Sequence, residues 1–191
     1  ASNGRNWWQH NLSFLGTKHA NNSWQFNLTL VFSSLLMVAL VDYIFVSLRA
    51  VVKNTWRTIT LRIILTVTAL DVGAVGLFPN NANFHILHDK VAGYLVYLII
   101  ILIVGIRWLL PEVGKRFLAL SYGMCVGLVI IDLMFKPLHI ISLTAFELIA
   151  FILAFGWILI LFDTMIGIVE DEDDKYDVKI EIDEQVKKNA D

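Results

Sequence analysis

Long apolar runs separated by short polar connectors make up most of the chain from residue 26 onward. Five of these runs are long enough to cross a bilayer, because a hydrocarbon core needs roughly 20 residues of α-helix. Lipid offers backbone amides no partner, so each run must be helical. We expect the spans Phe26–Leu48, Leu61–Phe78, Val91–Leu110, Phe117–Phe135 and Ile140–Val169. The predicted fold is an all-α, polytopic transmembrane bundle over residues 26–169.

The two segments that flank this bundle have different patterns. Residues 1–25 are polar and rich in tryptophan, which is typical of an interfacial segment in the headgroup layer. Within them, Leu12–Gly16 is expected to form a short helix along the membrane. Residues 170–191 open with the acidic block Glu170–Asp174, after which apolar and charged residues alternate as far as Asp183. That period of two predicts a strand, and we weigh a solvated, disordered tail against a strand added to a partner's sheet edge.

Composition restricts the classes of function. Hydrophobic residues make up 57% of the 191 positions and only 17% are charged, which is more apolar than a soluble domain of this size. The net charge of −2 excludes a strongly basic nucleic-acid binder. The single cysteine, Cys125, lies in an apolar run, so no intrachain disulfide can form. The lipid bilayer is therefore the first partner that we expect.

The basic residues predict the orientation. The connectors 49–60 and 111–116 are rich in Lys and Arg, whereas 79–90 and 136–139 carry only Lys90 and Lys136. The positive-inside rule makes the first pair cytoplasmic. We therefore expect a multi-pass plasma-membrane protein with residues 1–25 outside and the C-terminus inside. Because the chain begins at Ala1 on the outer side, we expect one more span upstream rather than a cleaved signal, which gives six helices in the full protein.

With this orientation several titratable residues fall on the outer side of the bundle. An ionisable group within a membrane costs about 2.5–3.5 kcal/mol on insertion scales, so it usually has a partner or a function. His85 and His88 share a helix face if the third helix starts by residue 84. The outer histidines are His10, His19, His85, His88 and His139, and the acids in the same half are Asp71, Asp132 and Glu147.

Imidazole and carboxylate groups together are suited to acid–base chemistry or to zinc binding. The candidate catalytic residues are His85, His88, Asp71, Asp132 and Glu147. The candidate ligands of a divalent metal such as zinc are His85, His88, Asp89 and His139. The alternatives are structural pairs with Lys90, Lys136 or the histidines, and a site for a transported ion or ligand.

A second polar set lies toward the inner side: Asp42, Arg49, Arg62, Arg107 and Asp163. We expect Arg62 and Arg107 to pair with Asp42 and Asp163 and to reach toward lipid headgroups. Gly123 and Gly127 form a small-xxx-small pattern that lets another helix approach, and Gly73 and Gly76 do so less convincingly. A protein partner or a second copy could use these glycines and the cytoplasmic tail.

Several short motifs resemble those of a bacterial family. They are Leu12-Ser13-Phe14-Leu15-Gly16, Trp24-Gln25-Phe26-Asn27, Gly73-Ala74-Val75-Gly76-Leu77-Phe78-Pro79 and His85-x-x-His88-Asp89-x-x-Ala92. The likeness covers nearly all of residues 1–169 and resembles a family of six-helix membrane proteins that is filed as a domain of unknown function, distantly similar to the Frag/DRAM/Sfk group. It implies six helices with an outer-side histidine and no particular activity.

Three functions follow as hypotheses. The first is a non-enzymatic subunit or accessory of a larger membrane assembly, which the small size, the glycines and the charged tail favour. The second is an outer-leaflet enzyme that modifies lipid or depends on a metal, with His85 or His88 as base or ligand. The third is a small transporter, which the apolar centres of the third and fourth spans disfavour.

Overall fold

The computed structural model is a bundle of long helices. It describes residues 11–52 and 55–188, with side chains as far as Asp171. The described residues contain helices and no strand, which confirms the predicted fold class. The elements are η2 (Leu12–Gly16), α1 (Ser23–Val51), α2 (Trp56–Leu77), α3 (His85–Leu109), α4 (Lys115–Phe135) and α5 (Leu143–Lys188).

Five of these helices are long and apolar enough to cross a membrane: α1 to α4, and α5 from Leu143 to Asp171. Every one of these helices leaves several large aliphatic and aromatic side chains exposed. In water that surface would cost about 25 cal/mol per Å², whereas lipid solvates it. Exposed tryptophans lie near the helix ends, with Trp24 at one end and Trp56 and Trp108 at the other, as expected where a membrane meets water.

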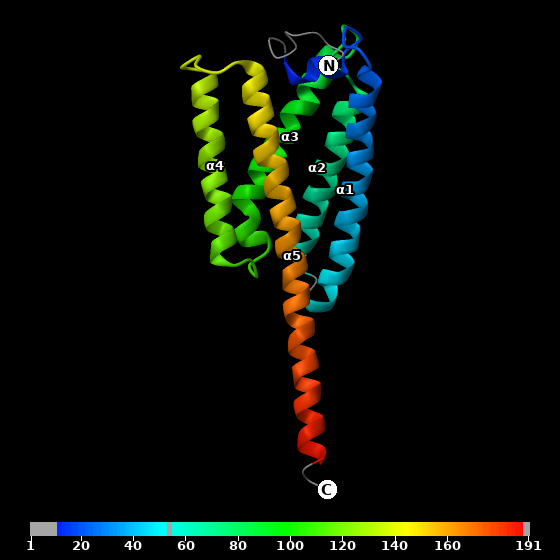
Figure 1. The fold of residues 1–191 in the computed structure, drawn as a ribbon, viewed down its shortest axis with the longest axis vertical. Coiled ribbons are helices and arrows are strands. Elements are labelled where there is room, and N and C mark those ends of the chain that lie inside the picture. The colour runs from blue at the N-terminus through cyan, green and yellow to red at the C-terminus, as the bar shows by residue number, and fades with distance from the viewer. Residues whose placement is uncertain (1–10, 53–54, 189–191) are drawn as a thin grey trace.

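The helices pack as neighbours in a simple order (Figure 1). α1 lies against α2, α2 against α3, and α5 lies between α1 and α4. We call the end that carries η2 and the connectors after α2 and α4 the histidine end. The opposite end, with the connectors after α1 and α3, is called the basic end. The short helix Leu12–Gly16 forms as predicted and lies at the histidine end.

The buried core lies where α1, α2, α3 and α5 meet. Fully buried side chains from all four helices contribute to it, including Leu48, Leu61, Ile106 and Leu161. α4 is more peripheral, since only 11% of its most apolar stretch is buried. A buried hydrogen bond links it to α5: the indole Nε1 of Trp157 donates to Ser121 Oγ at 2.9 Å. A buried indole N–H needs such an acceptor.

Two glycines of α2 let α1 approach closely. A Cβ at Gly73 would lie 2.6 Å from Ser34 Oγ, and one at Gly76 would lie 2.7 Å from the carbonyl oxygen of Asn27. By contrast, a Cβ at Gly123 would meet nothing within 4 Å. The sequence pattern ranked these pairs in the opposite order. Within this chain the second helix, not the fourth, carries the close contact.

The C-terminal segment corrects one prediction. The backbone of α5 continues as a helix to Lys188, so the strand predicted from the alternation was wrong. The sequence from Ile168 to Lys188 contains no glycine or proline. Once the apolar span has nucleated the helix, each further residue adds a hydrogen bond at low cost. We call residues 172–188 the C-terminal arm.

The α1–α2 contact predicts a contrast between two glycine substitutions. Gly76→Ala should destabilise the bundle by about 1–3 kcal/mol, because the new methyl group overlaps the α1 backbone. Gly123→Ala adds the same methyl group where there is space. Thermal unfolding in one detergent should therefore show a lower midpoint for Gly76→Ala and an unchanged or higher one for Gly123→Ala. Equal midpoints for the two variants would contradict the close α1–α2 packing.

Candidate functional site

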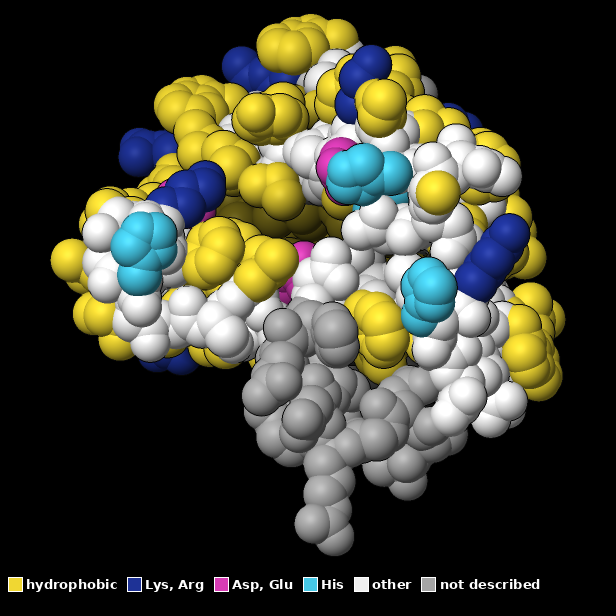
Figure 2. All heavy atoms as spheres, turned by 90° about the horizontal axis from the view of Figure 1, so that it is seen from above, with side chains coloured by type: hydrophobic (Ala, Val, Ile, Leu, Met, Phe, Trp, Pro, Cys, Tyr) yellow, Lys and Arg dark blue, Asp and Glu magenta, His cyan; other side chains and the backbone are white. Residues whose placement is uncertain are grey.

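The histidine end does not gather its titratable side chains into one place. Figure 2 views the molecule from this end, and the histidine side chains visible on this face lie apart from one another. His85 and His88 begin α3, and His139 lies in the connector after α4, where its φ of 50° is in the left-handed region. His19 follows η2, and His10 lies outside the described residues.

His88 joins two helix ends. Its side chain is buried, with 5% of the residue exposed, and its Nδ1 lies 2.8 Å from the carbonyl oxygen of Phe78. Phe78 is the C-cap residue directly after α2. Carbonyl groups at a helix C-terminus lack a partner within the helix. Because a carbonyl oxygen can only accept, Nδ1 carries a proton and donates to it. His88 thus ties the start of α3 to the end of α2.

His85 lies one turn earlier in α3 and is exposed. Its Nδ1 is 2.9 Å from Asn80 Oδ1, and its Nε2 is 3.5 Å from Asp89 Oδ2. Among the described residues, this is the contact that joins a predicted histidine to a predicted acid. Both partners of the pair are more than half exposed, so water screens their attraction.

The three predicted membrane acids have three different environments. Glu147 of α5 accepts a hydrogen bond from the backbone N–H of Leu12, which is the first residue of η2. Asp132 forms an ion pair with Lys136 across 3.0 Å, as the structural alternative predicted. Asp71 has a buried oxygen, Oδ2, without a hydrogen-bond partner in the described part of the chain. Among the described residues, no hydrogen bond or ion pair joins any of these three acids to a histidine.

The described residues contain no group of three or more His, Cys, Asp and Glu side chains placed to hold a metal ion. The proposed ligands His85, His88, Asp89 and His139 consequently have no geometric support beyond the His85–Asp89 contact. Their metal-binding role stays a prediction. So does the catalytic role of His85, His88, Asp71, Asp132 and Glu147.

Asparagines hold the N-terminal segment onto the bundle, a role that the sequence did not reveal. Asn80 Nδ2 donates to Ser13 Oγ at 3.2 Å, and Asn81 Oδ1 accepts from the backbone N–H of Lys18 at 3.0 Å. Asn27 Nδ2 donates to the carbonyl oxygen of Gly16 at 3.0 Å. The sequence Pro79-Asn80-Asn81 predicts a turn. It does not indicate which segment the asparagine side chains bond.

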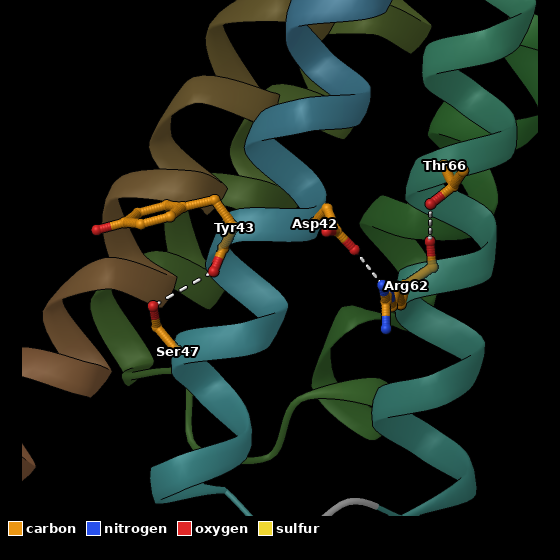
Figure 3. Close-up of polar contacts among 5 residues, drawn as sticks. All are labelled: Asp42, Tyr43, Ser47, Arg62 and Thr66. Atoms are coloured by element: carbon orange, nitrogen blue, oxygen red, sulfur yellow. Dashed lines mark hydrogen bonds and ion pairs between the residues drawn. The ribbon is translucent and has the colours of Figure 1, made fainter.

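An ion pair between two spanning helices lies toward the basic end. Arg62 of α2 pairs with Asp42 of α1, as predicted, and Figure 3 shows the two side chains pointing toward one another between the helices. The other predicted pair is not formed, since neither Arg107 nor Asp163 has an ion pair within residues 11–52 and 55–171. The Asp42–Arg62 pair is exposed, with 61% of the Asp42 side chain and 32% of the Arg62 side chain accessible.

Two clefts open near this end. The first, which we call the α1–α2 cleft, has a volume of about 680 Å³ and contains the Asp42–Arg62 pair. The second, about 690 Å³, lies beside the foot of the C-terminal arm, and we call it the arm-base cleft. Its lining comes from three regions: the facing ends of α1 and α2, the end of α3 with the connector after it, and α5. The lining residues are Val51, Val52, Thr55, Trp56, Arg57, Thr58, Leu109, Pro111, Glu112, Ile168 and Asp171. Both volumes are in the range typical of ligand pockets, roughly 300–1,000 Å³.

No protein-family model, curated protein or solved structure matches this chain. Its functional assignment therefore depends on the geometry of the bundle, the two clefts and the arm.

The contrast between the two histidines predicts different effects of removing them. His88→Ala should lower the free energy of unfolding by about 1–3 kcal/mol, because it leaves the Phe78 carbonyl without its donor and opens a buried space. His85→Ala removes an exposed side chain and should change it by less than about 0.5 kcal/mol. Detergent-mediated unfolding of both variants measures the difference. A larger loss for His85→Ala would show that the assignment of His88 as the helix tie is mistaken.

Proposed function

We propose that this protein is a membrane-embedded subunit of a larger assembly and that the C-terminal arm connects it to a protein partner. The observation that carries the proposal is the unbroken helix α5. After the last apolar residue of its span, α5 continues through the arm for roughly 26 Å, at 1.5 Å per residue. In Figure 1 the arm projects from the basic end beyond the rest of the bundle.

A single helix of this length gains little stability by itself in water. Packing against another surface is what normally stabilises such a helix. In the arm's sequence, Val178, Ile182 and Val186 recur at intervals of four, and positions four apart lie on one face of a helix. These three positions, which we call the arm stripe, would meet the partner.

Charge indicates what the partner surface carries. The sequence from Glu170 to Asp174 is wholly acidic, and like charges three and four positions apart destabilise a helix. A basic surface on the partner would relieve that repulsion. The arm-base cleft lies directly beside this block and would extend the contact onto the bundle. We therefore propose a partner with an apolar strip next to basic residues.

The proposal includes an orientation in the plasma membrane. The basic end would face the cytoplasm, because the basic connectors are at this end. The arm and its partner would then be cytoplasmic, and the histidine end would face outward. The two other hypotheses, an outer-leaflet enzyme and a small transporter, gain less support, since the histidine-end residues lie in separate contacts rather than in one site.

Substitutions in the arm stripe test the proposal. The full chain would be expressed in its source cells, extracted in mild detergent and analysed by light scattering for the protein mass of its complex. The double variant Val178→Gln and Ile182→Gln should reduce partner retention at least tenfold, since each side chain loses roughly 1.5 kcal/mol or more of apolar burial. Glu184→Gln, on the opposite face of the arm, is the matched control and should retain the partner.

A photoreactive amino acid at position 182 should crosslink to one protein at fixed stoichiometry, and one at position 184 should not. The proposal fails if the wild-type protein is monomeric in every native extract and the chain lacking residues 172–191 behaves identically in cells. It also fails if the partner persists when the arm is deleted.

A further inference from the structure

The α1–α2 cleft is divided into an apolar part and a polar part along the direction of the helices. Leu35, Val38 and Val67 line the apolar part, toward the middle of the bundle. The polar part, toward the basic end, carries Arg49 among the apolar side chains of Leu48 and Val52. The Asp42–Arg62 pair lies between the two parts (Figure 3). An apolar part beside a part that carries arginine side chains suits an acyl chain joined to a phosphate group.

The depth of the polar part fits the headgroup layer. Thr58 lies two positions along α2 from Trp56, an exposed tryptophan next to Arg57 at the start of the helix. Tryptophan and arginine at a helix end mark the membrane–water interface. Arg49 lies in the last turn of α1 at the same end. Arg62 follows Arg57 by five residues, which is about one and a half helical turns further into the membrane. Its flexible side chain can reach back toward the headgroup layer.

The charges in the cleft do not cancel. Arg49 and Arg62 line it together with one acid, Asp42, so the lining carries one excess positive charge. Asp42 accepts from one nitrogen of Arg62, Nη2, and a guanidinium has five N–H donors. Arg49 has no ion pair within the described side chains. Both arginines therefore keep N–H donors that no described acid uses, and an anionic oxygen is the complementary partner.

An open cleft at this depth is in contact with lipid unless a protein covers it. An exposed ion pair in the hydrocarbon layer is costly and needs further polar partners. The phosphate group of a phospholipid supplies such partners to both arginines. An acyl chain of the same lipid fills the apolar part of the cleft. A helix from another protein would have to leave the arginines unpaired or bring an acid to the same depth.

We propose that the α1–α2 cleft binds one phospholipid with an anionic headgroup. Arg49 and Arg62 hold the phosphate, and one acyl chain lies along Leu35, Val38 and Val67. Asp42 positions Arg62. A zwitterionic lipid can bind the arginines through its phosphate alone. Phosphatidylglycerol is therefore preferred to phosphatidylcholine, because it keeps the negative charge that the excess arginine complements.

Native mass spectrometry and nanodiscs test this proposal on the full chain. In nanodiscs made of equal parts phosphatidylglycerol and phosphatidylcholine, the protein should unfold at a higher temperature than in phosphatidylcholine alone. The protein extracted from such discs should retain one phosphatidylglycerol molecule. Arg49→Gln should weaken that retention about tenfold, as expected when one charge-assisted hydrogen bond is lost.

Two further variants separate a specific site from general attraction to a charged surface. Ala39→Phe fills the apolar part of the cleft without changing any charge, and should reduce retention as much as Arg49→Gln does. Arg116→Gln removes an exposed charge on α4 at the same end, outside the cleft, and should leave retention unchanged.

Three results would overturn the proposal. The first is equal loss for Arg49→Gln and Arg116→Gln, with Ala39→Phe unaffected, which would mean that only a diffuse charge attracts the lipid. The second is the absence of any retained lipid and of any thermal shift. The third is a second protein chain that covers the cleft and is lost in Ala39→Phe.

Discussion

In the hydrocarbon layer no water reaches a backbone amide, and this constraint accounts for most of the structure. Every spanning segment must satisfy its own hydrogen bonds, so the apolar runs are helices and their connectors are short. Lipid is as apolar as the side chains, so burial of apolar surface contributes little to holding the helices together. Close packing and a few polar contacts do so instead: Gly73 and Gly76 against α1, and Trp157 with Ser121.

The same constraint separates the polar residues of the two ends. At the histidine end, polar side chains complete helix ends and connectors: His88 bonds the end of α2, Glu147 bonds the start of η2, and asparagines hold the N-terminal segment. These side chains are bonded within the chain, whereas Asp71 has a buried oxygen without a partner among the described residues. At the basic end, the arginines near the α1–α2 cleft keep unused donors, and α5 extends beyond the bundle. Both proposals rest on these arginine donors and on the extended helix.

The sequence predicted the helices well because hydropathy reports the bilayer constraint directly. It predicted the Asp42–Arg62 pair because two opposite charges at one membrane depth have few other partners. It could not predict how helices turn about their axes, so His85 and His88 were expected to act together although one is exposed and the other is buried. It ranked Gly123 above Gly73 because small-residue spacing does not show which face meets a neighbour. The alternation of apolar and charged residues in the arm predicted a strand, but the arm continues the helix that begins in the preceding span.

Chemical labelling of two connectors tests the membrane arrangement most directly. In a Cys125→Ser background, Asn83→Cys lies before α3 at the histidine end and Glu112→Cys lies after it at the basic end, and both positions are exposed. Only α3 separates them. A membrane-impermeant maleimide added to intact cells should modify position 83, and should modify position 112 only after the membrane is opened. Labelling of both from one side would show that α3 does not cross the membrane, and labelling of position 112 alone would show that the basic end faces outward.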